Sequence, residues 1–129
     1  MFERLFEKEA KGVLKGMTLE WVCPSCAGTN FRLLSAEDRT TGLYHDHCRY
    51  CRTRERVAFP PAAGALEGEA AFCERLNDEH FTDEEQKELI RDFAEIEYMR
   101  ADNANPREVT GRQRMLEEKI VFFKHRRRA

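Results

Sequence analysis

The sequence contains no long apolar run: none of its hydrophobic stretches approaches the roughly 18–20 residues that a membrane-spanning helix needs. Its opening residues, MFERLFEK, carry acidic side chains where a secretory signal would need an apolar stretch. Internal repeats and low-complexity tracts are also missing. We therefore expect a cytoplasmic protein with no membrane partner. A length of 129 residues suits one compact domain, or a small module joined to a helical one, and excludes a large multidomain machine.

Charged residues, in contrast, are abundant and unevenly distributed. They make up 36% of the chain, above the roughly 25% usual for soluble domains. The net charge is +2 for residues 1–64 (10 basic, 8 acidic), −9 for 65–106 (4 basic, 13 acidic) and +5 for 107–129 (8 basic, 3 acidic). An acidic middle beside a basic tail predicts either pairing within the molecule or two different partners.

Cysteine gives the strongest signal in the sequence. Five cysteines in a chain with no secretion signal argue against a disulfide framework, because the cytosol keeps thiols reduced. Four of them form two Cys-x-x-Cys pairs, Cys23/Cys26 and Cys48/Cys51, with 21 residues between the inner members. This spacing predicts one zinc ion held by four thiolates, which leaves no open coordination position, so the ion is structural and not catalytic. The fifth cysteine, Cys73, is expected in an apolar helix face.

Other interpretations of the quartet remain open. Four unrelated buried thiols would be a coincidence of spacing, and a thioredoxin-like redox role would use only one pair and lacks the expected βαβ context. A rubredoxin-like iron site is a further alternative, although the glycines expected behind such turns are missing. His45 or His47 could also replace a cysteine as a ligand.

The hydrophobic pattern predicts an α+β protein in three parts. Residues 1–17 are expected to form an N-terminal helix, because apolar residues recur at helical spacing over 2–15. A small antiparallel β zinc ribbon is expected over 18–60, and a helical domain of about three helices over 65–129. The expected strands of the ribbon are 18–22, 31–34, 43–47 and 54–59. The segment PPAAG at 60–64 breaks all periodicity and separates the ribbon from the helices.

Local signals mark the helices of the third part. Thr82 and Glu85 form a capping box, and Pro106 suits the first position of a later helix. Four phenylalanines are expected in the core: Phe81, Phe93, Phe122 and Phe123.

Between the cysteine pairs, the sequence FRLLSAEDRTTGLY at 31–44 resembles the zinc ribbon of transcription elongation factors of the S-II type and of related small RNA polymerase subunits. The resemblance covers about residues 18–59. In that family an acidic pair at a hairpin tip enters the polymerase pore and helps to hold a metal ion for transcript cleavage. Here only Glu37 and Asp38 match that pair. The arm before the pair is shorter than the family's and the arm after it is longer, and a plain solvated turn remains the other interpretation.

A basic cluster accompanies the second cysteine pair. Arginines interleaved with an aromatic ring suit contact with phosphates or an exposed base, and the cluster consists of Arg49, Tyr50, Arg52, Arg54 and Arg56. The period-2 spacing of the last three arginines places them on one strand face. An ordinary charged sheet face is the competing interpretation.

These features lead to one main hypothesis and two alternatives. The main hypothesis is a non-catalytic, transcription-related regulator whose zinc ribbon docks on RNA polymerase or a nucleic-acid complex. The first alternative is an inhibitor or adaptor that binds a basic protein partner through the acidic segment 67–102. The weaker alternative is a metal-dependent nuclease that uses His45, Asp46, His47 and His80. A strand and Pro60-Pro61 stand where such a nuclease would need a helix.

Overall fold

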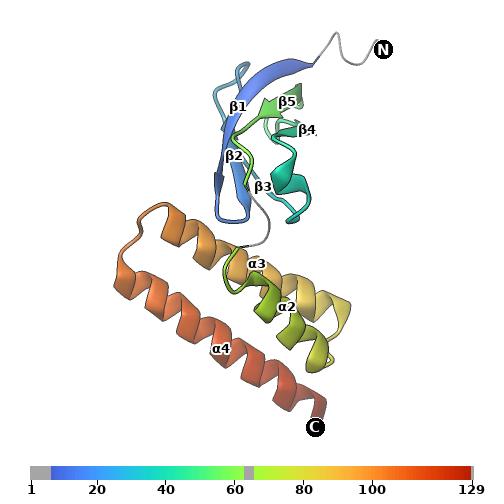
Figure 1. Ribbon diagram of the computed structural model, residues 1–129, viewed down its shortest axis with the longest axis vertical. Helices are drawn as coiled ribbons and strands as arrows, with labels where there is room; N and C mark the ends of the chain where they lie inside the picture. Colours follow the sequence, from blue (N-terminus) through green and yellow to red (C-terminus); the bar gives the residue numbers. More distant parts are fainter. Residues whose placement is uncertain (1–6, 63–65, 129) are drawn as a thin grey trace. The chain divides into compact units, whose positions relative to one another are not determined.

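The computed structural model describes residues 7–62 and 66–128 (Figure 1). The chain divides into two compact units, 1–64 and 65–129, and the division falls just after the proline pair. The first unit is a sheet and the second is helical, so the expected α+β class is confirmed. In the described part of the chain, no helix is long and apolar enough to cross a membrane.

A five-stranded mixed sheet forms the first unit. The strands are β1 (Lys8–Lys15), β2 (Thr18–Val22), β3 (Thr29–Leu33), β4 (Leu43–His47) and β5 (Arg54–Ala58). Their order in the sheet is β3-β2-β1-β5-β4. The hairpins β2–β3 and β4–β5 are antiparallel, and β1 joins them by pairing antiparallel to β2 and parallel to β5. The two predicted hairpins are therefore present, within a larger sheet than a ribbon alone.

The sequence prediction of an N-terminal helix over residues 1–17 is wrong for the described part of that segment. Residues 8–15 are strand β1, and residues 1–6 lie outside the described residues. Strand β1 pairs with β2 on one side and with β5 on the other, and this pairing outweighs the weak helical spacing of its apolar residues. Ala10 is buried opposite Val57, and Gly12 lies so close to its neighbours that an added Cβ would be 2.7 Å from Val57 and 2.8 Å from Leu19. The missing side chain of glycine thus permits this close approach inside the sheet.

The inner face of the sheet carries the core of this unit. Its buried apolar side chains are Ala10, Leu19, Trp21, Leu34, Val57 and Phe59. Buried Glu55 shares this face and accepts a hydrogen bond of 3.2 Å from the Trp21 indole. The sheet curls so far that its two edge strands approach each other: Arg32 on β3 donates a hydrogen bond of 2.7 Å to Asp46 on β4.

Three helices form the second unit: α2 (Glu69–Asp78), α3 (Asp83–Ala101) and α4 (Pro106–Arg128). The predicted capping box is confirmed, since the Thr82 side chain accepts from the Glu85 N–H and the Glu85 side chain accepts from the Thr82 N–H. The buried core consists of Leu76, Phe81, Leu89, Ile96, Val109, Leu116, Ile120 and Phe123, with Phe93 partly buried against it. Phe122 was expected there too, but it is 61% exposed because its neighbour Phe123 takes the inward position on α4.

Many charged side chains of this unit form ion pairs between helices. Lys119 of α4 contacts Asp92 of α3 at 2.8 Å, and Arg126 contacts the buried Glu85 at 2.7 Å. Further pairs join Arg112 to Glu95, Lys124 to Glu79, and Arg75 to Glu117. The basic tail and the acidic middle therefore pair within the molecule.

Candidate metal centre

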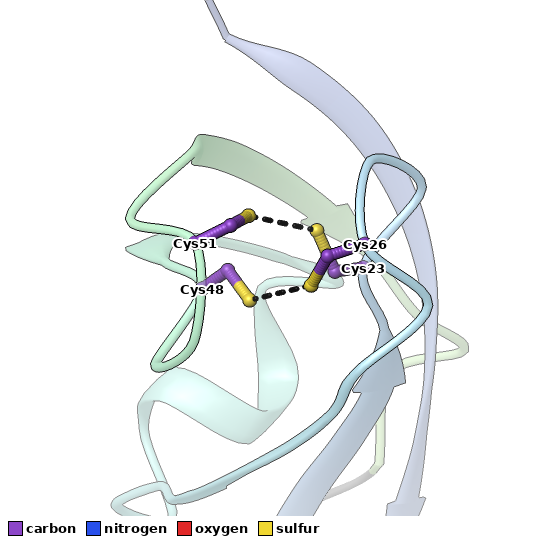
Figure 2. Close-up of side chains that lie close together, drawn as sticks. All are labelled: Cys23, Cys26, Cys48 and Cys51. Atoms are coloured by element: carbon purple, nitrogen blue, oxygen red, sulfur yellow. Dashed lines mark hydrogen bonds between the residues drawn. The ribbon is translucent and has the colours of Figure 1, made fainter.

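Each Cys-x-x-Cys turn, or knuckle, lies at the tip of a hairpin. The first knuckle connects β2 to β3, and the second connects β4 to β5. The four sulfurs of Cys23, Cys26, Cys48 and Cys51 converge between the two knuckles (Figure 2) and all lie within 4.8 Å of one another. Within the described residues, this is the one group of three or more potential metal-ligating side chains. The sequence prediction that the two pairs meet is confirmed.

The sulfur positions fit a tetrahedral ion. Sulfurs that surround an ion at about 2.3 Å lie about 3.8 Å apart along each edge of a tetrahedron. The Cys23–Cys51 and Cys26–Cys48 sulfur distances are both 3.6 Å, close to that edge and much longer than the roughly 2.05 Å of a disulfide. The donor set of four sulfurs suits one thiophilic metal ion. The first cysteine of each pair is buried and the second is exposed, so the centre lies at the surface of the sheet.

The two knuckles have the same backbone geometry. The N–H of Cys23 donates to the carbonyl of Gly28, and the N–H of Ala27 donates to the carbonyl of Cys23. In the second knuckle, Cys48, Thr53 and Arg52 repeat these two bonds. In both, the residue after the second cysteine has a positive φ of 65°.

A left-handed conformation at that position usually calls for glycine. The sequence has Ala27 and Arg52 there instead, which is why the usual glycine signal is missing although the turn itself is present. The amide N–H of Ser25 points at the Cys23 sulfur and that of Tyr50 at the Cys48 sulfur, at 3.4 Å each. Such amide contacts favour thiolate over thiol at both buried sulfurs.

Hydrogen bonds favour ionisation in the second knuckle. Burial raises the pKa of Cys48, but the N–H groups of Cys51 and Tyr50 and the amide of Asn30 outweigh it and lower the pKa to about 6. The Thr53 hydroxyl lies 3.1 Å from the Cys51 sulfur and is the main cause of the lowered pKa of that thiol.

The first knuckle behaves in the opposite way. Burial raises the pKa of Cys23. The N–H of Gly28 lowers the pKa of Cys26, but desolvation and the neighbouring sulfurs of Cys48 and Cys51 outweigh it and raise the pKa to about 12. Four thiols at this spacing cannot all lose their protons unless a cation compensates the negative charge. Metal binding is therefore coupled to loss of the last protons.

Asn30 is the main site residue that the sequence analysis missed. Its side chain is 2% exposed and connects the two knuckles: the amide donates to the Gly28 carbonyl at 3.4 Å and to the Cys48 sulfur at 3.5 Å, and its oxygen accepts from the Arg49 N–H at 2.8 Å. An asparagine in strand β3, two residues after Gly28, was the only sequence signal for this role.

The basic cluster lies on and next to the second knuckle. Arg54 and Arg56 are exposed on the outer face of β5, opposite the buried Glu55 and Val57. The predicted common face of three arginines is correct for these two but not for Arg52, which lies in the left-handed turn before the strand.

Tyr50 lies across the first knuckle and is 61% exposed. A Cβ added to Gly28 would be 2.4 Å from the Tyr50 ring, so the ring packs directly on the glycine backbone. The Arg49 guanidinium lies 5.2 Å from the ring centroid. The missing side chain of Gly28 therefore leaves room for the Tyr50 ring beside the metal centre.

The acidic pair lies at the other end of the sheet from the cysteines. β3 runs away from the first knuckle and β4 returns to the second, so the connection between them is far from the centre. It contains the short 3₁₀ turn η1 (Asp38–Thr40), where Glu37 and Asp38 are exposed. The next residue, Arg39, is fully buried and donates to the Leu34 carbonyl at 3.0 Å, which anchors the turn.

Within the sheet unit, the candidate nuclease residues do not converge. His45 and His47 are exposed on the outer face of β4, whereas Asp46 points to the inner face and binds Arg32. His80 belongs to the helical unit. Cys73 is half-buried on α2, and burial raises the pKa of its thiol, followed by the charge of Glu69.

Comparison with known proteins identifies no relative: no protein family, curated protein or solved structure matches this chain. The likeness to S-II type ribbons therefore rests on the cysteine spacing and the acidic pair alone.

Proposed function

We propose that the metal is a single zinc ion with a structural role. Four protein sulfurs complete a tetrahedral shell and leave no position for a substrate or a water molecule. The centre joins the tips of the two hairpins, whose edge strands β3 and β4 are not paired with each other. Zinc bound there stabilises the closed form of a small sheet that buries few apolar side chains.

We further propose that the zinc-bound sheet unit docks, without catalysis, on nucleic acid within a transcription complex. The observation that carries this proposal is the exposed cluster around the second knuckle. Arg54 and Arg56 project from one strand face, and Arg49, Tyr50 and Arg52 are exposed in the knuckle that precedes this strand. Phosphates bind such guanidinium groups, and the exposed Tyr50 ring offers a surface for an unstacked base. Glu9, 3.8 Å from Arg56, is an acidic neighbour in this region.

The knuckle makes this surface depend on the metal. The Tyr50 N–H points at the Cys48 sulfur, and the Arg49 N–H is bonded to Asn30, which also contacts that sulfur. Loss of the ion releases the backbone that positions both side chains. Zinc chelation should therefore abolish docking, although in this proposal neither the zinc ion nor its cysteine ligands contact the nucleic acid.

The proposal predicts a measurable salt dependence. We expect the zinc-bound chain to bind short DNA or RNA at low salt, and the Arg52→Ala/Arg54→Ala/Arg56→Ala variant to bind at least tenfold more weakly. The slope of log K against log salt should fall by about 2–3, since each lost phosphate contact contributes about 0.7–0.9.

A matched control removes three exposed arginines from the helical unit: Arg91→Ala/Arg107→Ala/Arg114→Ala. It changes the net charge equally and should retain affinity. Undetectable binding at low salt, or equal losses in both triple variants, would refute the proposal. Zinc affinity measured on the same variants shows whether the arginines act on the metal centre instead.

The resemblance suggests RNA polymerase as the larger partner. In this proposal Glu37 and Asp38 form an acidic contact at the end of the sheet opposite the zinc. Purified RNA polymerase should retain the chain, and Glu37→Gln/Asp38→Asn should weaken retention without changing affinity for free nucleic acid. No retention of the wild-type chain would remove polymerase from the proposal and leave nucleic-acid docking to be judged by the arginine variants.

A further inference from the structure

The helical unit has a groove where its shortest helix begins. α2 has 10 residues, against 19 in α3 and 23 in α4. At 1.5 Å per residue, α2 is about 15 Å long and α3 about 28 Å, so α2 covers roughly half of the surface that α3 and α4 form together. A cavity of about 390 Å³ lies at the N-terminal end of α2, between the three helices.

The floor of this groove is apolar and ordered. Phe72 of α2 and Phe93 of α3 stack with their ring centroids 4.6 Å apart and an interplanar angle of 13°. Ile96 and Leu116, both members of the buried core, complete the floor. Because these side chains are already packed, an apolar ligand would gain contacts here without first ordering the surface.

The rim of the groove is mainly acidic. Glu67, Glu97 and Glu117 line it, with Arg100 as the one basic residue. Glu97 lies 3.5 Å from Arg100, and Glu117 accepts two hydrogen bonds of 2.8 Å from Arg75. Within the described part of the chain, Glu67 makes no ion pair and is exposed.

Among the described residues, the chain leaves space beside Gly68 at one end of the groove. Gly68, the N-cap of α2, has a φ of +81° and provides no side-chain cap. A Cβ added there would meet nothing within 4 Å. A ligand that lies along this end of the groove therefore meets no side chain at position 68.

We propose that this groove binds a short, basic amphipathic helix of a partner protein. The α3–α4 surface already accepts one helix, α2, and the groove beside the start of α2 has an apolar floor against which such a helix packs side chains at positions i, i+3 or i+4, and i+7. Three glutamates against one arginine line the rim, and residues 65–129 as a whole carry 12 basic and 16 acidic side chains, which favours a basic segment over an acidic one. All the residues that line the groove belong to the helical unit, so the proposed binding requires neither the metal nor nucleic acid.

The test uses two synthetic 14-residue peptides, each with leucine at every third or fourth position and a fluorescein label. In one peptide the remaining positions are mainly lysine, and in the other they are mainly glutamate. We expect the zinc-bound full chain to bind the lysine peptide at least tenfold more tightly by fluorescence anisotropy. Amide chemical-shift changes should centre on Phe72, Phe93 and Ile96.

Two charge-reversed variants provide the control. Glu67→Lys at the rim should weaken binding of the lysine peptide at least fivefold. Glu118→Lys makes the same charge change on an exposed α4 position outside the groove and should have little effect. No binding, equal binding of both peptides, shifts centred elsewhere, or equal losses in both variants would overturn the proposal.

Discussion

Replacement of Asn30 by leucine tests how the two knuckles are held together. Leucine has the same branched skeleton of side-chain heavy atoms as asparagine, with bulkier methyl ends, but neither donates nor accepts hydrogen bonds. It removes the amide contacts with the Cys48 sulfur and the Gly28 carbonyl, and it leaves the Arg49 N–H without its acceptor. The four cysteines stay in place, so any change in zinc affinity reports on their support.

The magnitude follows from burial. Asn30 is 2% exposed, so water cannot readily replace the lost partner. A buried N–H left unsatisfied costs about 1–3 kcal/mol, which corresponds to about 5- to 160-fold in an equilibrium constant. Loss of a residue that orients metal ligands typically costs about 10- to 100-fold in metal affinity. We expect the zinc dissociation constant to rise by about 10- to 100-fold.

The assay is a competition titration against a chromophoric zinc chelator at fixed pH. Ser25→Ala is the matched control, because Ser25 contacts the Cys23 sulfur through its backbone N–H, which the substitution retains. Asn30→Asp keeps the shape and the acceptor for Arg49 but places a carboxylate beside the Cys48 sulfur, so it should weaken binding at least as much as leucine. If Asn30→Leu binds zinc within twofold of the wild type, the bridge between the knuckles does not support the site.

Three further predictions concern local structure. Ala27→Gly should raise the stability of the zinc-bound chain by up to about 1.5 kcal/mol, because relief of the left-handed conformation (about 1–2 kcal/mol) exceeds the added chain entropy (about 0.5–1 kcal/mol). A lower thermal midpoint would contradict this. Thr82→Ala should destabilise the helices by about 1 kcal/mol in urea unfolding followed at 222 nm, and an unchanged midpoint would show that the capping box contributes nothing. The Arg75 hydrogen bonds hold the pKa of Glu117 below its usual value, so their stabilisation is present above the unfolded pKa of about 4.5 and is lost as pH falls through the lower folded pKa. The difference in thermal midpoint between the wild type and Glu117→Gln should therefore shrink on acidification below about pH 4.5, and a difference that stays constant would disprove the assignment.

The sequence was most informative where a local chemical requirement dictates the structure. Two Cys-x-x-Cys pairs must lie on tight turns to bring their sulfurs together, so the hairpins around them could be predicted together with the ligands. The same holds for the helix that begins at Thr82, because its capping residues bond within one turn. In both cases the interacting groups are close in sequence.

The errors arose where distant pairing decides the structure. β1 reads as a weak helix until its partner β5, more than 40 residues later, supplies the second set of hydrogen bonds. Asn30 looks like an ordinary strand residue until the second knuckle folds onto it. Phe122 and Phe123 differ in exposure only through the rotation of α4, which a pair of adjacent phenylalanines does not specify.

The central claim is that one zinc ion with four sulfur ligands joins the two hairpin tips. X-ray absorption at the zinc edge on the purified chain, combined with metal quantitation, tests it most directly. We predict one zinc per chain and a single shell of four sulfurs at about 2.3 Å. A chain with no bound metal, or a shell in which nitrogen or oxygen replaces one of the sulfurs, would contradict the claim.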